Sequence, residues 1–161
     1  MYQDYKDLLS AFHAHGVRYL VVGGYAVIFH AQPRFTKDMD FFIKPDPSNA
    51  DAVFAALVDF GAPLEGIRAE EFADSRNFFR FGYDPRGFDI LPNIPGVDFD
   101  EAWERRVEAV VDESSGLKAN FISADDLISA KLAAGRPQDL ADADAIRQAQ
   151  YSKSGSPRNQ A

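Results

Sequence analysis

Residues 38–43, which read Asp-Met-Asp-Phe-Phe-Ile, restrict the fold of this chain more than any other segment. In an extended segment Met39, Phe41 and Ile43 share one face, while Asp38 and Asp40 share the other. Two carboxylates two residues apart on a strand lie roughly 6 to 7 Å from each other. That spacing suits a hard divalent cation, which would remove the repulsion between them. The pattern therefore predicts a strand with an apolar face toward a core and a metal site on the opposite face.

A glycine pair precedes this strand. Residues 18–22 form an apolar, β-prone run that stops at Gly23 and Gly24, and residues 25–31 contain no helix breaker. The predicted order is strand, glycine turn and short buried helix. Glycines at such a junction let a phosphate approach the backbone, and the helix N-terminus supplies free N–H groups. The alternative is a tight turn that only packs the helix against the strand.

A third carboxylate follows in a predicted hairpin. Residues 78–83 and 88–91 read as two strands joined by the turn 84–87. Asp89 interrupts the second, otherwise apolar strand, and an unpaired buried charge there is costly. We therefore expect Asp89 to be paired, hydrogen-bonded or bound to a metal; the alternative is a strand-end aspartate that faces water.

The C-terminal part adds two further predicted helices. Ser123 and Asp126 are typical of a capped helix start, Gly135 is placed to end that helix, and Pro137 suits the first turn of the next. Lys131 lies on or beside the apolar face of the first of these helices. A lysine directed at the interior requires an anionic partner.

Taken together, these residues resemble the nucleotidyltransferase superfamily of the DNA polymerase β type, and in particular its small stand-alone bacterial members, such as domains similar to AbiE-type toxins and the antibiotic nucleotidyltransferases. The resemblance covers about residues 17–149 and rests on Gly23-Gly24, Arg34, Thr36, Asp38-x-Asp40 and the later strand aspartate Asp89. One departure is that many members carry Gly-Ser in the turn where this chain has Gly-Gly. Backbone N–H groups would then replace the serine contact to phosphate.

The resemblance implies a specific reaction. Two metal ions, Mg²⁺ or Mn²⁺, would be held by Asp38 and Asp40, with Asp89 as the third carboxylate and activator of the acceptor hydroxyl. A nucleoside monophosphate would pass from an NTP donor to a hydroxyl, with release of pyrophosphate. Gly23 and Gly24 would hold the triphosphate. The acceptor would be a small molecule, a tRNA or a protein.

Three further residues, Arg34, Thr36 and Lys131, have alternative interpretations. Arg34 could clamp the triphosphate or be a solvated loop arginine, and Thr36 could hydrogen-bond Asp38 or a phosphate. Lys131 resembles a lysine of the toxin-like members, which would contact nucleotide phosphate. Its alternative role is a salt bridge that attaches the last helices to the sheet. The supporting residues implied by the Arg-x-x-Asp-x-x-Asp run are Arg136, Asp139 and Asp142.

An alternative function is a nucleotide-binding component of a toxin–antitoxin pair, which would require an antitoxin partner for activity. A net charge of −8 argues against sequence-blind binding to nucleic acid. Arg76, Arg80 and Arg86 surround the predicted hairpin and could flank the phosphates of an acceptor, or could simply be solvated. The chain has no cysteine and no His/Cys cluster, which argues against disulfides and zinc.

These elements predict an α+β, nucleotidyltransferase-like fold, in which helices pack on one side of a mixed, twisted β-sheet. We expect a single domain over residues 1–150 and a disordered tail over residues 151–161. The sequence shows neither a membrane-spanning stretch nor a secretion signal, so a cytoplasmic protein without a membrane partner is expected. The remaining expected elements are helices at 3–15, 47–60 and 99–106 and strands at 108–112 and 117–122.

Overall fold

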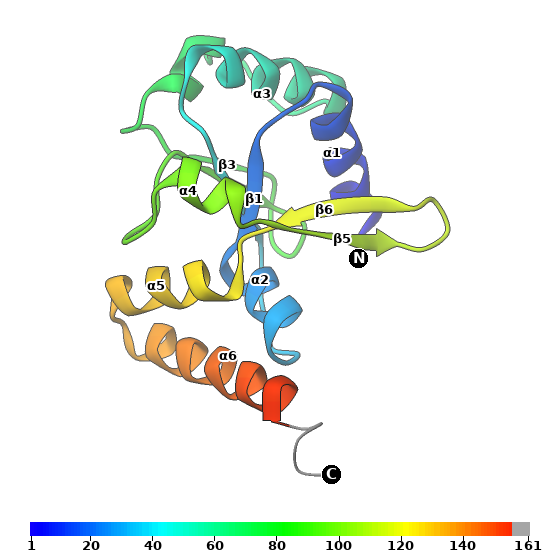
Figure 1. Cartoon of the computed structure of the whole chain (residues 1–161). Coiled ribbons are helices and arrows are strands. Elements are labelled where there is room, and N and C mark those ends of the chain that lie inside the picture. The colour runs from blue at the N-terminus through cyan, green and yellow to red at the C-terminus, as the bar shows by residue number, and fades with distance from the viewer. Residues whose placement is uncertain (156–161) are drawn as a thin grey trace.

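The computed structural model describes residues 1–155 and shows an α+β fold built on one open, twisted, six-stranded mixed sheet (Figure 1). The sheet order is β3-β4-β2-β1-β6-β5. Pairs β1/β6 and β2/β4 are parallel, and pairs β1/β2, β3/β4 and β5/β6 are antiparallel. The fold class predicted from sequence is thereby confirmed. The strands are β1 (Tyr19–Val22), β2 (Met39–Ile43), β3 (Phe79–Phe81), β4 (Phe88–Leu91), β5 (Val107–Asp112) and β6 (Leu117–Phe121).

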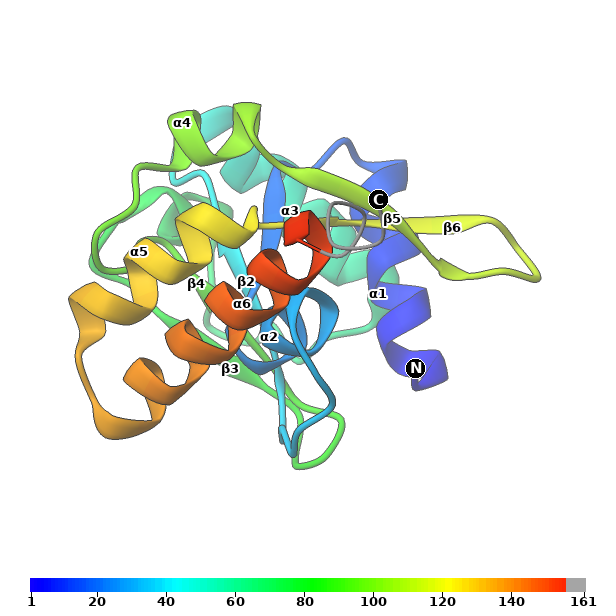
Figure 2. The same cartoon turned by 60° about the horizontal axis from the view of Figure 1, so that its bottom comes forward.

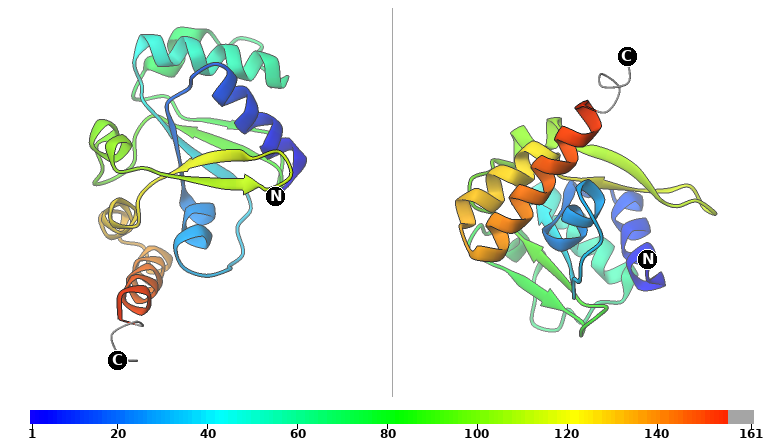
Figure 3. Two further views of the ribbon diagram at one scale, coloured as in Figure 1. Left: turned by 45° about the vertical axis from the view of Figure 1, so that its right-hand side comes forward. Right: turned by 90° about the horizontal axis from the view of Figure 1, so that it is seen from below.

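The helices form two groups. The α-helices are α1 (Gln3–Ala14), α2 (Gly23–His30), α3 (Pro47–Phe60), α4 (Phe99–Glu104), α5 (Ala124–Ala134) and α6 (Pro137–Gly155), and a 3-10 helix η1 spans Ala69–Ala73. Helices α1 and α3 lie on one side of the sheet, while α2, α5 and α6 lie together on the other (Figures 1 and 3). The expectation that helices pack on one side only is wrong, because β1 is buried at every position and β2 carries buried Phe42 on the same face as Asp40, so both faces of the central strands need a cover.

Two helices, η1 and α6, differ from the prediction. Helix η1 was not expected, since its sequence, Ala-Glu-Glu-Phe-Ala, is too short to show a period. Helix α6 continues to Gly155, past the point where we expected the tail to begin. Residues 156–161 of that predicted tail lie outside the described residues. Figure 2 shows the β5–β6 hairpin extending away from the rest of the sheet.

Aromatic packing fixes the first helix and the central strands. Tyr5, Leu8, Leu9 and Phe12 of α1 are buried. The ring of Phe12 lies 5.1 Å from that of Phe41 on β2, edge to face. This contact turns the apolar face of β2 toward α1 and leaves Asp40 on the opposite face. The alternation seen in the sequence is therefore the alternation of the folded strand.

Local signals define helix α3 at both ends. The side chain of Asp46 accepts a hydrogen bond of 2.7 Å from the backbone N–H of Asn49, and Pro47 occupies the first turn. At the other end Gly61 adopts φ +90°, a left-handed conformation that favours glycine. Among the described residues, no helix is both long and apolar enough to cross a membrane.

Strand register brings charged residues of the sheet together. In the parallel pair β2/β4, Asp40 lies beside Asp89. In the antiparallel pair β3/β4, Arg80 lies opposite Asp89. In the pair β1/β2, Val22 lies opposite Asp40, so the start of α2 follows directly beside it. The sheet therefore places a row of Asp40, Asp89 and Arg80 next to the glycine turn.

Candidate active site

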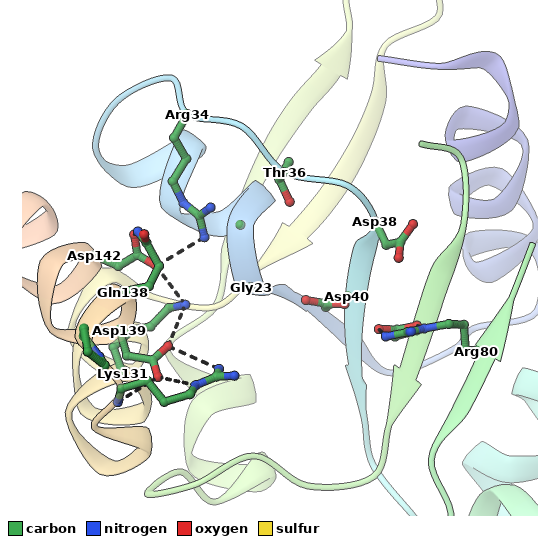
Figure 4. Close-up of a pocket in the computed structure, with 14 residues that line it drawn as sticks. Gly23, Arg34, Thr36, Asp38, Asp40, Arg80, Lys131, Gln138, Asp139 and Asp142 are labelled. Carbon is green, nitrogen blue, oxygen red and sulfur yellow. Dashed lines mark hydrogen bonds and ion pairs between the residues drawn. The ribbon is translucent and has the colours of Figure 1, made fainter. Parts of the chain in front are cut away.

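A cavity of about 460 Å³ lies where the glycine turn, the acidic strands and the last two helices meet (Figure 4). Every site residue predicted from the sequence is in its lining, although they come from segments more than a hundred residues apart. The lining residues are Gly23, Gly24, Arg34, Thr36, Asp38, Asp40, Arg80, Asp89, Lys131, Arg136, Pro137, Gln138, Asp139 and Asp142. Their location is an observation, and their individual roles stay predictions.

The glycine pair is required by close packing. Gly23 has φ +65°, and a Cβ there would overlap the carboxylate of Asp40. A Cβ on Gly24 would overlap the hydroxyl of Thr36. Within residues 1–155 no side chain caps the N-terminus of α2. The positive end of this helix therefore points into the cavity without a side-chain cap, which suits an anion.

One side of the cavity, which we call the strand wall, consists of Asp38, Asp40, Arg80 and Asp89. Burial, and then the charges of Asp89 and Asp38, raise the pKa of Asp40 to about 7. Burial and then the neighbouring Asp84 raise the pKa of Asp38. The Oδ1 atom of Asp38 is buried and has no hydrogen-bond partner among the described residues. The strand wall thus holds more negative charge than the protein neutralises.

Asp89 is paired with an arginine. Arg80 donates from Nε to Oδ1 at 2.9 Å and from Nη2 to Oδ2 at 3.1 Å, a two-point contact. Asp89 is only 6% exposed, so it is not a strand-end aspartate facing water. The contact raises the pKa of the Arg80 guanidinium. One cation therefore serves three acidic side chains of the strand wall.

The opposite side, which we call the helix wall, consists of Lys131, Arg136, Gln138, Asp139 and Asp142. Lys131 Nζ lies 3.0 Å from Asp142 Oδ2 and 3.5 Å from Asp139 Oδ1. Arg136 Nε donates to Asp139 Oδ2 at 2.8 Å, and Gln138 Nε2 donates to Asp142 Oδ1 at 2.9 Å. The salt bridge considered for Lys131 is present. Lys131 nevertheless lines the cavity and lowers the pKa of Asp40 by its charge.

Asp139 shows how completely the helix wall is neutralised. Burial by itself would raise the pKa of Asp139. Hydrogen bonds from the side chain and backbone of Arg136, with the charge of Lys131, outweigh burial and lower this pKa overall. The carboxylate is therefore stable in its ionised form although the residue is 3% exposed.

Arg34 connects the loop after α2 to the helix wall. Its Nη2 donates to Asp142 Oδ2 at 3.2 Å and its Nη1 to the carbonyl of Phe35 at 2.8 Å. Its buried Nε has no hydrogen-bond partner among the described residues. Arg34 is therefore held at the cavity and is not a solvated loop residue. Thr36 also faces the cavity, but from the loop, because β2 begins only at Met39.

The donor set has some of the features that a divalent cation requires. Asp38 and Asp40 offer hard oxygen ligands, and their pKa values are raised first by burial and then by neighbouring carboxylates, whose repulsion a cation would relieve. Among residues 1–155, however, no group of three His, Cys, Asp or Glu side chains is arranged to hold a metal ion. Asp89, the third carboxylate, is instead in contact with Arg80. The residues fit a two-carboxylate site, which Asp89 can join only if Arg80 releases it.

Three residues of the cavity, Arg80, Pro137 and Gln138, were not assigned to the site from sequence. Gln138 gave no signal, because it contributes only through its contact with Asp142. Arg80 was expected either to flank the phosphates of an acceptor or to be solvated, whereas the structure pairs it with Asp89. Counting outward from the predicted turn at 84–87 would have placed Gly82 opposite Asp89, whereas the observed connection is 82–87, so the pair could not be identified from the sequence.

Comparison with known proteins identifies a family for the part of the chain that forms the cavity. A search of curated proteins found no match. A family model described as "Nucleotidyltransferase of unknown function (DUF6036)" matches residues 3–150, which is most of the chain and includes every residue of the cavity. The chain therefore belongs to this nucleotidyltransferase family.

Proposed function

We propose that this protein is a metal-dependent enzyme that transfers a nucleoside monophosphate from an NTP to a hydroxyl group and releases pyrophosphate. One observation carries the proposal. The under-neutralised pair Asp38 and Asp40 lies against Gly23, at the uncapped N-terminus of α2, inside a cavity that also contains cationic side chains. An NTP with its cations supplies both the positive charge that the acids lack and the anion that the helix end and the basic residues attract.

The protein's residues would act mainly by positioning and by charge. Asp38 and Asp40 would hold Mg²⁺ or Mn²⁺, with Asp89 as a third ligand or as the acceptor of the hydroxyl proton. When bound, the metal neutralises charge on the phosphates and on the leaving pyrophosphate. The backbone at Gly23 and Gly24, with Arg34, Thr36 and Lys131, would hold the triphosphate in line for attack.

The bond changes are those of a simple displacement. The acceptor oxygen forms a bond to the α-phosphorus, and the bond from that phosphorus to the β-bridging oxygen breaks. The hydroxyl proton moves to a carboxylate or to solvent, and the electron pair of the broken bond leaves with pyrophosphate. This reaction requires no nucleophilic side chain of the protein.

A second candidate is a nucleotide-binding protein that depends on a partner, such as an antitoxin, for activity or regulation. The observation that favours it is the two-point contact between Arg80 and Asp89, which occupies the third carboxylate. In this case a partner would have to displace Arg80 before transfer could begin.

Label transfer separates these two functions. The full chain is incubated with Mg²⁺ or Mn²⁺, with each of the four NTPs labelled at the α-phosphate, and with cellular RNA, protein or small-molecule extract as acceptor. Label that appears in one fraction and is lost in Asp38→Ala supports the enzyme and names donor and acceptor class. Binding of NTP and metal by calorimetry without any transfer supports the partner-dependent protein. Absence of both binding and transfer refutes both.

A further inference from the structure

A second, smaller cavity of about 160 Å³ adjoins the polar one, between α5 and the loop 92–97 that follows β4. We call it the apolar slot. It shares part of its lining with the polar cavity, including Gly23, Asp40 and Lys131. The residues that line the slot but not the polar cavity are Val22, Leu91, Ile94, Pro95, Leu127, Ala130 and Ala134. All of these are apolar, in contrast to the charged lining next to them.

The outer wall of the slot is fixed in place on both sides. Gly96 has φ +71°, and a Cβ there would lie 2.8 Å from the Cβ of Ala133 and 3.1 Å from the carbonyl oxygen of Ser129. The loop therefore packs directly on helix α5. On its other side, Asn93 donates from Nδ2 to the carbonyl of Ser75 at 2.6 Å. A slot with walls held in this way is preformed and does not require the binding of a ligand to create it.

The order of residues along the two cavities indicates what the slot binds. Gly24, Arg34 and Thr36, which suit phosphate, line only the polar cavity. Asp40 lines both, so the metal-binding centre would lie at their junction. An NTP has its phosphates on one side of the α-phosphorus and its nucleoside on the other. With the phosphates at the glycine turn, the nucleoside extends from Asp40 toward the slot.

We infer that the apolar slot binds the nucleobase of the donor nucleotide, an inference that rests on the function proposed above. The flat apolar faces of a base match walls of aliphatic side chains. Because the residues specific to the slot offer no polar side chain, discrimination between bases rests on size and shape. Apolar contacts of this kind separate related ligands by about 10- to 200-fold, far less than hydrogen-bonded recognition does.

The test measures the affinity of the full chain for each NTP and for inorganic tripolyphosphate, by calorimetry with Mg²⁺ and without acceptor. Tripolyphosphate serves as the probe that lacks a nucleoside. Ala134→Leu fills the slot from its exposed side, and Ala130→Leu fills it from its buried side. The matched control is Ala141→Leu, which changes another exposed helix alanine that lines neither cavity. Ala134→Leu keeps the test valid if the buried variant fails to fold.

We expect the wild type to bind at least one NTP about tenfold more tightly than tripolyphosphate. Ala134→Leu should remove most of that difference while its affinity for tripolyphosphate stays within about twofold, and Ala141→Leu should change neither affinity.

Three results would overturn the inference. If Ala134→Leu binds NTPs as the control does, the base lies elsewhere, and the proposed enzyme stands. A preference of about 10⁴-fold for one base would require hydrogen-bonded recognition, which the apolar residues specific to the slot do not offer, and would contradict base binding by their contacts. If the wild type binds neither NTP nor tripolyphosphate, the proposed function fails together with the inference.

Discussion

The two walls of the polar cavity treat the same residue type in opposite ways. On the strand wall, burial and neighbouring acids raise the pKa of Asp40 to about 7, and one buried oxygen of Asp38 has no hydrogen-bond partner within residues 1–155. On the helix wall, Asp139 and Asp142 are more deeply buried, yet each contacts cationic or amide donors, and the pKa of Asp139 is lowered. Burial raises the pKa of both carboxylates, and the partners of Asp139, which Asp40 lacks, reverse the direction of the shift.

This difference separates structural from functional charge. The helix wall has its positive charges supplied by the chain, so it can form in the absence of any ligand. The strand wall lacks that charge and carries an electrostatic cost, which persists because the rest of the fold imposes the register. Figure 4 shows the two sets of side chains on either side of Gly23. The following predictions test whether the two walls differ in this way.

The largest effect is expected for Asp40→Asn in the label-transfer reaction. Loss of a ligand carboxylate removes several kcal/mol of charge stabilisation, so transfer should fall by about 10³-fold. Asp51→Asn, an exposed aspartate of α3, is the control and should be unaffected. An Asp40→Asn variant that keeps a tenth or more of the wild-type rate would mean that the strand wall is not catalytic.

A substitution that breaks the ion pairs of the helix wall should lower the stability of the protein. Asp142→Ala leaves Lys131, whose side chain is 13% exposed, and Arg34 without their shared partner. We expect the free energy of unfolding to fall by about 2–4 kcal/mol, as for other broken buried ion pairs. Urea unfolding measures it, and Asp144→Ala, at an exposed position of the same helix, should change it by less than about 0.5 kcal/mol. Equal losses for the two variants would remove the distinction between the walls.

The pH dependence of stability should have opposite signs at the two walls. Asp40 has a folded-state pKa of about 7 against an ordinary value of 3.8, so the folded protein binds the extra proton between these values. Stability should therefore decrease as pH rises through this window. In buffer that contains a chelator at pH 8, the free energy of unfolding of Asp40→Asn should exceed that of the wild type by about 1–2 kcal/mol. At pH 3.5 the two proteins should not differ.

Asp139 supplies the comparison for that measurement. Its folded-state pKa is lowered, so its ionised form contributes stability above the ordinary value of 3.8 that is lost as pH falls. Asp139→Asn should therefore be less stable than wild type at neutral pH, and the difference should shrink in acid. Denaturant unfolding across the pH range tests both variants, and a matching sign for Asp40→Asn and Asp139→Asn would contradict the comparison.

The smallest effect is expected for metal binding by Arg80→Gln. Removing the guanidinium frees Asp89 and leaves the strand wall more negative, so Mn²⁺ should bind about 3- to 10-fold more tightly in the absence of nucleotide. Calorimetry or the spin-resonance signal of free Mn²⁺ reports this. The control is Arg86→Gln, because Arg86 lies over the ring of Tyr2 and does not line the cavity. Unchanged or weaker binding in Arg80→Gln would show that Arg80 does not compete with the cation.

Local sequence patterns predicted much of the fold. The strand before Gly23, the helix after it and the alternation through Met39 and Asp40 are all present, because these signals act over a few residues. Helix α3 begins and ends at the predicted residues. Prediction was less successful for η1 and for the C-terminal end of α6. A five-residue helix shows no period, and the polar composition near residue 151 resembles that of a tail.

The sequence alone determined most of the residues that form the cavity, since the glycine pair, the strand acids and the Lys131 helix were each recognisable from short patterns. Only the tertiary structure decided how their charges are shared. Arg34 meets Asp142 across 108 positions of the chain, and Arg80 meets Asp89 through strand register. The apolar slot likewise arises from a loop and a helix that are distant in sequence. Side-chain type is a local property, but the energy of a buried charge depends on neighbours that long-range packing brings to it.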